Sequence, residues 1–390
     1  MNTKRTEPMM VPDPDALAGV QLLCNSRDPY RTGSEHDALF IRAMQEILLW
    51  HQQRSPFFAA LLGSQQIDPR AIATIEDLAR IPTIHANFFK THELLSVDRS
   101  ALCSSLTSSG TTGQKSQMFY DPFTLLSGQQ MVAAIFSYYG WDRPDKQTNY
   151  LLYAYEPLPA SRLGTSHTNT FLCRFAPAAR VSYVLRATGT SSHEFDLFGA
   201  IRTLQEYADE GLPVRIFGFP SFLYFTLVRM RDLGISVTLP ADSLVFLGGG
   251  WKGAAGEQIS KSELYALITD RLGIPDDRCR EGYGSVEHSV PYVECAHHHL
   301  HQPVWSRVLI RDVSSLQPLN DGEPGFLHFL TPHTTSVPAV SVLMGDLAVL
   351  HRDCPCGLST PYFEVLGRAG VSKNRSCAVA AAELLQREAL

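Results

Sequence analysis

The sequence predicts an α/β fold, because short apolar segments of strand length alternate with segments that have a helical pattern. Residues 214–218 form a short, mainly apolar run that ends at Gly and Pro, as a buried strand does. Residues 243–247 form a similar run, and three glycines follow it. Residues 260–271 have the pattern of a helix, since Ser260 and Glu263 lie at the spacing of a capping box.

The flanking segments extend this pattern towards both ends of the chain. Residues 1–34 are rich in Pro, Asp and Arg, and we expect them to lie on the surface. Residues 35–53 carry apolar side chains at three- and four-residue steps, which predicts an amphipathic helix. Residues 307–311 and 325–330 are predicted strands, and the Ala-rich residues 377–387 are a predicted helix.

Composition excludes several classes of protein. The chain has 390 residues, and its 33 Lys and Arg against 39 Asp and Glu leave a net charge of −6, which argues against a general nucleic-acid binder. It lacks an apolar run of about 18 residues, so we expect no membrane span. Eight cysteines at irregular spacing do not form the pattern of a secreted disulfide framework. We therefore expect a cytoplasmic protein with reduced thiols.

A polar stretch at residues 106–116, L-T-S-S-G-T-T-G-Q-K-S, has the composition of a phosphate-binding loop. Glycines let backbone N–H groups approach an anion, hydroxyl groups donate hydrogen bonds to phosphate oxygens, and a lysine adds positive charge. It is not a Walker loop, because Gln114 separates the last glycine from the lysine. A flexible polar loop is the alternative. The candidate nucleotide-binding residues are Thr107, Ser108, Ser109, Gly110, Thr111, Thr112, Gly113 and Lys115.

The order T-S-S-G-T-T-G-x-K resembles the phosphate loop of the adenylate-forming superfamily, whose enzymes join a carboxylate to AMP. Three later segments resemble the same superfamily in the same order: G-Y-G-S-V-E at residues 282–287, Gly345-Asp346, and L-G-R at residues 366–368. The resemblance implies the following roles: Tyr283 and Gly284 beside adenine, Glu287 on Mg²⁺, Asp346 on the ribose hydroxyls, and Arg368 on ribose or phosphate.

A closer resemblance is to the acyl-protein synthetases of bacterial luminescence, the LuxE-like family. The segments that carry it are I-P at residues 81–82, F-F-K-T-H at 88–92, G-G-G-W-K-G at 248–253, S-V-P-A at 336–339 and the tail at 366–385. It covers the chain from about residue 35 onward. It implies that a fatty acid and ATP give an acyl-AMP, and that the acyl group passes to a cysteine near the C-terminus, then to a reductase partner.

The cysteine at that place is Cys377. It is expected in the first turn of the last helix, where N–H dipoles and the charges of Lys373 and Arg375 favour a thiolate nucleophile. The alternative is a small residue that packs an Ala-rich helix. Most superfamily members also carry a mobile C-terminal domain with a Lys that contacts the adenylate. Lys373 and Lys252 are the candidates to replace that Lys.

The expected domain organisation follows from these resemblances. Residues 1–34 are a surface segment, and residues 35–368 have the fold of the N-terminal domain of adenylate-forming enzymes. Residues 369–390 are a short, truncated tail in place of the mobile domain, which argues against a coenzyme A tunnel. The acid-binding pocket is expected within residues 140–250, and its candidate lining residues are Tyr153, Phe219, Phe222 and Trp251.

A cysteine- and histidine-rich pair of segments predicts a metal site. Cys295 precedes a run of histidines, and Cys354 and Cys356 lie one residue apart some fifty residues further on. Three cysteines with one of His299 or His301, of which we favour His301, complete a tetrahedral ligand set for a structural Zn²⁺. Unligated thiols beside solvated histidines are the alternative.

The sequence therefore predicts an ATP- and Mg²⁺-dependent enzyme that activates a carboxylic acid and transfers the acyl group to Cys377. An aryl- or acyl-CoA ligase is one rival, as is a free-standing adenylating enzyme that delivers acyl-AMP to another acceptor. A non-catalytic subunit that binds acyl groups or a reductase is another. Release of pyrophosphate with a suitable acid separates the enzymes from the last of these.

Overall fold

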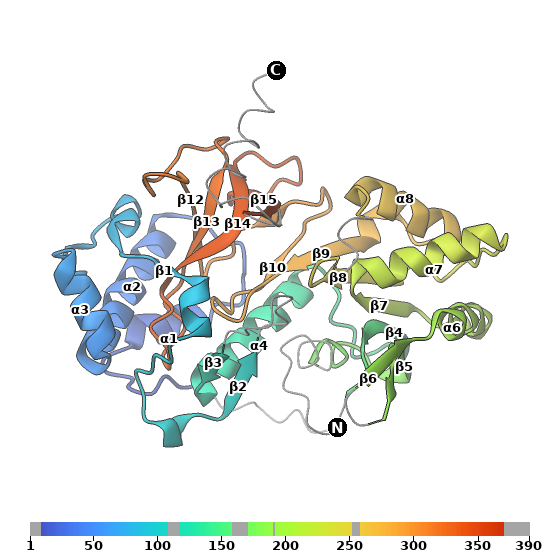
Figure 1. Cartoon of the computed structure of the whole chain (residues 1–390), viewed down its shortest axis with the longest axis horizontal. Helices are drawn as coiled ribbons and strands as arrows, with labels where there is room; N and C mark the ends of the chain where they lie inside the picture. Colours follow the sequence, from blue (N-terminus) through green and yellow to red (C-terminus); the bar gives the residue numbers. More distant parts are fainter. Residues whose placement is uncertain (1–8, 108–116, 158–170, 190–191, 252–257, 370–390) are drawn as a thin grey trace.

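A computed structural model describes residues 9–107, 117–157, 171–189, 192–251 and 258–369, and it confirms the α/β fold (Figure 1). The helices of this part of the chain are α1 (Ala18–Cys24), α2 (Ser34–Arg54), α3 (Pro56–Ser64), α4 (Pro122–Tyr138), α6 (Leu197–Glu210), α7 (Pro220–Asp232) and α8 (Lys261–Leu272). None of the helices within these ranges has the length and apolarity to cross a membrane.

A seven-stranded sheet forms one half of the molecule. Its order is β10-β9-β8-β7-β4-β5-β6, and its central five strands are parallel, whereas β10 and β6 add antiparallel edges. Parallel sheets are usually covered on both faces, which explains why every residue of β7 is buried. The strands are β4 (Thr148–Tyr155), β5 (Ala178–Thr188), β6 (Ser192–Phe195), β7 (Val214–Gly218), β8 (Leu244–Gly248), β9 (Cys279–Tyr283) and β10 (Tyr292–Val293).

Two hydrophobic cores lie on the two faces of this sheet. Helices α6, α7 and α8 cover one face and bury residues such as Leu204, Leu227 and Ile268 against the strands. Helix α4 lies on the other face, where Phe136 and Phe217 belong to the larger core that continues into the second sheet. In such open parallel sheets ligands bind at the carboxyl ends of the strands, so that edge is where a site is expected.

A second sheet has six strands and is largely antiparallel. Its order is β11-β15-β14-β13-β12, and β1 pairs in parallel with β14. A separate antiparallel hairpin is formed by β2 (Ser104–Thr107) and β3 (Gln117–Tyr120). The strands of the second sheet are β1 (Ile84–His85), β11 (Leu300–His301), β12 (Arg307–Arg311), β13 (Gly325–Leu330), β14 (Ser341–His351) and β15 (Tyr362–Arg368).

The predicted helices are confirmed where the structure describes them. Helix α2 covers the amphipathic segment, and α8 begins after Ser260. The Ser260 side chain accepts from the backbone N–H of Glu263 while the Glu263 carboxylate accepts from the N–H of Ser260, so both halves of the capping box are present. The predicted helix at residues 377–387 lies outside the described residues.

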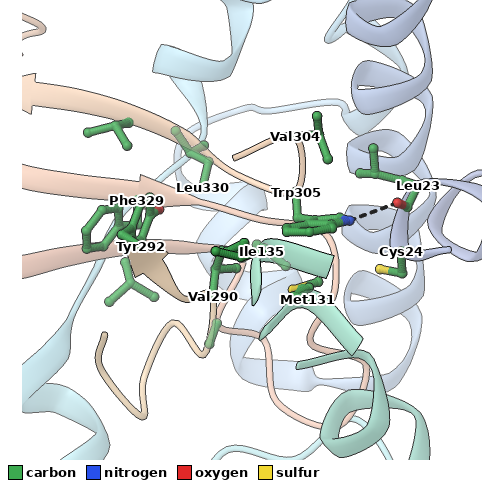
Figure 2. Packing of buried hydrophobic residues seen from close by; sticks show 14 of the residues in the cluster. Leu23, Cys24, Met131, Ile135, Val290, Tyr292, Val304, Trp305, Phe329 and Leu330 are labelled. Atoms are coloured by element: carbon green, nitrogen blue, oxygen red, sulfur yellow. Dashed lines mark hydrogen bonds between the residues drawn. The ribbon is translucent and has the colours of Figure 1, made fainter. Parts of the chain in front are cut away.

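The N-terminal segment is not confined to the surface, contrary to the expectation for residues 1–34. Leu17, Val20 and Leu23 are wholly buried, and the indole Nε1 of Trp305 donates to the carbonyl of Leu23 at 3.1 Å (Figure 2). Figure 2 shows α1 packed beside this ring together with Met131 of α4. The composition of the segment hid a small apolar face whose partners lie far along the chain, so from residue 9 onward the segment is part of the same folded unit.

Candidate active site and metal centre

The carboxyl end of β9 meets the second sheet through a hydrogen bond between two of the predicted site residues. The Tyr283 hydroxyl donates to Asp346 Oδ2 at 2.9 Å. Asp346 on β14 is paired in register with Arg368 on β15, and Arg368 Nε lies 3.6 Å from Asp346 Oδ1. The structure thus brings together Tyr283, Asp346 and Arg368, which are separated by up to 85 residues of sequence.

The surroundings of Tyr283 keep its phenol protonated, so that it donates the hydrogen bond to Asp346. Burial, and then the negative charge of Asp346, raise the pKa of Tyr283 well above its usual range, so the phenol stays a donor. The ring also lies among aromatic neighbours, with centroids 5.8 Å from those of Phe329 and Phe363. The Arg368 side chain is 68% exposed, so its guanidinium remains open to a ligand.

Glu287 lies in the turn that follows β9, on residues 284–289. Glu287 is 6% exposed, and burial, and to a lesser extent the negative charge of the nearby Glu287, raise the pKa of Tyr120. A carboxylate oxygen is a ligand that Mg²⁺ prefers in proteins. The predicted role of Glu287 as a Mg²⁺ ligand therefore fits the chemistry of this position. Ser285, in the same turn, has its hydroxyl 3.9 Å from Met344 Sδ of β14.

The phosphate-binding loop joins the two strands of the β2–β3 hairpin. Thr107 is the last residue of β2 and pairs with Gln117 at the start of β3. The predicted ligands Ser108, Ser109, Gly110, Thr111, Thr112, Gly113 and Lys115 lie outside the described residues, as do Lys252, Lys373 and Cys377. The hairpin fixes where the loop begins and ends, and its base is adjacent to the Glu287 turn, because Tyr120 of β3 hydrogen bonds to Val286.

Aromatic side chains gather where β4 and β7 end. The ring of Tyr155 lies 5.6 Å from Phe219 and 5.0 Å from His193. Phe222, in the first turn of α7, lies 6.2 Å from Phe219. Tyr153 is wholly buried in the core beneath α6 and α7, and its role as a pocket residue stays a prediction. Successive residues of a strand point to opposite faces, so Tyr155 and Tyr153 share a face, but only Tyr155 lies at the open end.

The four predicted metal ligands are gathered at one place. Cys295, His301, Cys354 and Cys356 each offer a ligand atom, and these atoms all lie within 4.8 Å of one another. Cys295 Sγ is 3.7 Å from Cys354 Sγ, and Cys356 Sγ is 3.3 Å from His301 Nε2. A tetrahedral zinc ion with Zn–S of about 2.3 Å and Zn–N of about 2.0 Å requires S···S and S···N separations of about 3.8 and 3.5 Å. The spacing is that of a preformed tetrahedral site.

The environment of this cluster, the Cys3His site, favours metal binding by His301 rather than His299. His301 Nδ1 lies 3.1 Å from the Thr360 carbonyl, which leaves Nε2 to face the thiols, and burial lowers the pKa of the ring to about 4. The His299 ring stacks on Tyr362 with centroids 4.1 Å apart, and its Nδ1 lies 3.1 Å from Cys354 Sγ, but only His301 has a ligand atom within 4.8 Å of all three sulfurs. Burial raises the pKa of Cys295 and Cys354, so their protons must leave when a metal binds.

Sequence reasoning missed two groups beside the site. Tyr120, directly after the phosphate-loop hairpin, contacts the turn that carries Glu287. Lys261 at the start of α8 forms ion pairs with Glu281 of β9 and with the fully buried Glu294. Neither Tyr120 nor Lys261 belongs to a sequence motif. The only signal in the sequence is the general tendency of aromatic and charged residues to lie near the ends of strands.

The fold is that of the adenylate-forming ligases. A crystal structure of an open conformation of 2-hydroxyisobutyryl-CoA ligase with 2-HIB-AMP and CoA matches with a TM-score of 0.64 and 15% identity, over 89% of this chain and 79% of that one. The same ligase in the thioesterification state matches with a TM-score of 0.64 and 16% identity, over 93% and 73%. At this identity the likeness establishes the fold, and the class of protein rests on the sequence family.

Within that class, the chain belongs to the LuxE family of acyl-protein synthetases, whose model matches residues 10–386. It is 22% identical over 283 residues to the long-chain-fatty-acid–luciferin-component ligase of Vibrio harveyi, covering 72% of this chain and 71% of the relative. The ligase of the same name from Aliivibrio fischeri is 21% identical over 89% of this chain and 88% of its own. Phenylacetate-coenzyme A ligase of Thermus thermophilus is 25% identical over 81% and 67%. The match begins at residue 10, so the buried N-terminal segment belongs to the family region as well.

Proposed function

We propose that this protein uses ATP to activate a carboxylic acid, in the first place a fatty acid, as an acyl-AMP. The observation that carries the proposal is the contact of Tyr283 and Arg368 with Asp346 in an adenylate-forming fold. A carboxylate oxygen attacks the α-phosphorus of ATP, the bond from that phosphorus to the bridging oxygen breaks, and pyrophosphate leaves. The reaction transfers no proton, so the protein contributes positioning and the stabilisation of charge.

The predicted residues that the structure describes have surroundings that fit the proposed roles. Asp346 accepts hydrogen bonds and suits the ribose hydroxyls, and the exposed Arg368 suits ribose or phosphate. Residues 107–115 suit the phosphates. Glu287 would hold Mg²⁺, which when bound offsets the negative charge of the phosphates and of pyrophosphate. The aromatic group around Phe219 is positioned to contact the apolar part of the acid.

The second step of the proposal is transfer of the acyl group to Cys377. The thiolate attacks the acyl carbon, a thioester forms, AMP leaves, and the acyl group moves on to a partner protein such as an acyl reductase. Lys373 provides positive charge beside this chemistry. Family membership supports the step, and the names of the Vibrio and Aliivibrio relatives, which specify a long-chain fatty acid and a luciferin component, support the acid and the acceptor.

A CoA ligase is the second candidate, because phenylacetate-coenzyme A ligase is similar in sequence and 2-hydroxyisobutyryl-CoA ligase is similar in fold. In that case coenzyme A, rather than Cys377, would accept the acyl group. Consumption of coenzyme A together with the acid and ATP distinguishes this candidate from the first.

A pyrophosphate-release screen over fatty, aryl and amino acids, with ATP and Mg²⁺, tests the first step. On a good substrate, Glu287→Ala and Asp346→Ala should each lower kcat/KM by about a hundredfold or more, because the first removes the carboxylate that would hold Mg²⁺ and the second removes the acceptor of the ribose hydroxyls. Asp232→Ala, which removes an exposed carboxylate of α7, is the matched control and should retain full activity. Near wild-type rates in either site variant would show that its assigned role is wrong.

Intact mass spectrometry tests the second step. With acid, ATP and Mg²⁺, the wild-type protein should gain an acyl mass that hydroxylamine removes. Cys377→Ser should still release pyrophosphate in a first turnover. It should gain no hydroxylamine-labile mass, because serine has no thiol and cannot form the thioester. Accumulation of free acyl-AMP without acylated wild-type protein would favour the second candidate.

We further infer that the Cys3His site holds one structural Zn²⁺ in a cytoplasmic protein with reduced thiols. Four protein ligands leave no open position for a substrate. The ion would tie the segment after β10 to the loop between β14 and β15, and thereby support the strand that carries Asp346. Protein purified without added metal should contain about one equivalent of zinc, and Cys356→Ser should lose it while Cys103→Ser, outside the site, keeps it. Clear sub-stoichiometry in well-folded wild-type protein would contradict the inference.

A further inference from the structure

The base of the phosphate-loop hairpin is attached to the turn that carries Glu287. Tyr120, the last residue of β3, is 4% exposed, and its hydroxyl donates to the carbonyl oxygen of Val286 at 2.8 Å. The same hydroxyl lies 2.8 Å from Ser289 Oγ. One side chain of the hairpin therefore contacts the residue before Glu287 and the residue two positions after it.

The turn is held by its own internal hydrogen bonds and by the buried His288, whose Nε2 lies 2.9 Å from the Tyr292 hydroxyl. Ser289 has a positive φ of 63°, its N–H donates to the Ser285 carbonyl at 2.8 Å, and its hydroxyl donates to the Val286 carbonyl at 2.8 Å. A non-glycine residue in this conformation is held there by its surroundings. Glu287 is 6% exposed and is part of this turn, so the backbone of the turn sets where its carboxylate lies.

The other side of the hairpin base is fixed to the segment between β13 and β14. The carbonyl of Phe119 accepts from Ser336 Oγ at 2.7 Å. The Asp121 carboxylate accepts from Thr335 Oγ1 at 2.6 Å and from the Thr124 N–H at 2.7 Å. These residues flank Tyr120 on both sides, so the hairpin base is a firm point from which Tyr120 reaches to the turn.

We propose that Tyr120 is a positioning residue, which holds the turn that carries Glu287 against the base of the β2–β3 hairpin, so that the Glu287 carboxylate is placed where it would hold Mg²⁺. This inference rests on the proposed adenylation function and deepens it. Tyr120 acts through the backbone of the turn and does not itself touch the nucleotide. Because the two strands of the hairpin carry the phosphate loop between them, a single hydroxyl links the phosphate-binding and metal-binding parts of the site.

The first test replaces Tyr120 by Phe, which removes the hydroxyl and keeps the ring. Loss of one hydrogen bond predicts that the Mg²⁺ concentration for half-maximal pyrophosphate release rises about fivefold. Saturating Mg²⁺ should restore kcat, and KM for the acid should not change. Tyr150→Phe is the matched control, because Tyr150 is equally buried and its hydroxyl also donates to a backbone carbonyl, that of Ala176, at 3.0 Å.

The second test does not depend on turnover. Mn²⁺ binding is measured by electron paramagnetic resonance in the presence of α,β-methylene-ATP, an analogue that cannot transfer its AMP group to the acid. Tyr120→Phe should weaken Mn²⁺ about fivefold, Tyr150→Phe should not, and Tyr120→Phe should have no further effect once Glu287 is replaced by Gln. This lack of additivity is expected only if Tyr120 acts through Glu287.

The outcomes separate this inference from the proposed function. If the wild-type protein neither releases pyrophosphate with any acid nor binds Mn²⁺ with the nucleotide, the proposed function is wrong. If the wild type does both and Tyr120→Phe has an unchanged metal requirement, the positioning role is wrong. An equal shift in Tyr120→Phe and Tyr150→Phe, or additive effects with Glu287→Gln, would also overturn it.

Discussion

Replacing Tyr283 by Phe removes the hydroxyl that holds Asp346. That hydroxyl donates to a carboxylate whose side chain is only 12% exposed, and hydrogen bonds to charged groups contribute about 1.5 to 3 kcal/mol. Arg368 remains 3.6 Å away, but it is largely exposed, and exposed ion pairs contribute little. The lower bound of about 1.5 kcal/mol corresponds to about a tenfold loss of apparent ATP affinity.

The assay is pyrophosphate release as a function of ATP concentration at saturating acid and Mg²⁺. KM for ATP should rise about tenfold in Tyr283→Phe, and the free energy of unfolding should fall by no more than about 3 kcal/mol, since only the hydrogen bond is lost and the ring keeps its contacts with Phe329 and Phe363. Tyr150→Phe serves again as the control for loss of a buried hydroxyl. A KM within twofold of the wild type would refute the claim that Tyr283 fixes Asp346 for the nucleotide.

Three further predictions concern stability. Burial lowers the pKa of His51 to about 3, whereas the unfolded chain takes up that proton below about pH 6.5. Through His51, stability is therefore lost as the pH falls from 6.5 towards 3, by about 2 kcal/mol at pH 5. Other buried histidines such as His333 add losses of their own, so in urea unfolding His51→Asn should lose about 2 kcal/mol less than the wild type over this range. Gly218→Ala should lower the free energy of unfolding by about 4 kcal/mol or more, because its Cβ would lie 2.2 Å from the Tyr153 carbonyl oxygen at a φ of 129°. A zinc chelator should lower the thermal midpoint of the wild type but leave Cys356→Ser unchanged, as measured by calorimetry.

Local patterns were sufficient to predict most of the elements near the site. Residues 214–218, 307–311 and 325–330 were predicted as strands from short apolar runs and their turn residues, and the structure has them with the same bounds. The spacing of Cys354 and Cys356 predicted a turn that presents two sulfurs, and the four ligand atoms do converge. In these cases the information lies within a few residues of sequence.

Contacts between distant segments could not be predicted in the same way. The burial of Leu23 depends on Trp305, and the anchoring of Val286 depends on Tyr120, across 282 and 166 residues respectively. Tyr153 and Tyr155 have the same sequence signature, and only the length of β4 decides which of them reaches the open end of the sheet. Such distinctions come from packing, which a single sequence does not display.

The contact between Leu23 and Trp305 has a consequence for how the protein is made. Helix α1 leaves the ribosome early, but its partner is synthesised 282 residues later. At bacterial elongation rates of about 5 to 20 residues per second, the interval is roughly 15 to 60 seconds. During that time the apolar side chains of α1 have no completed core to enter, so the nascent chain depends on chaperones or on its own neighbouring helices. Full-length synthesis, rather than the speed of local helix formation, sets when this part of the molecule becomes native.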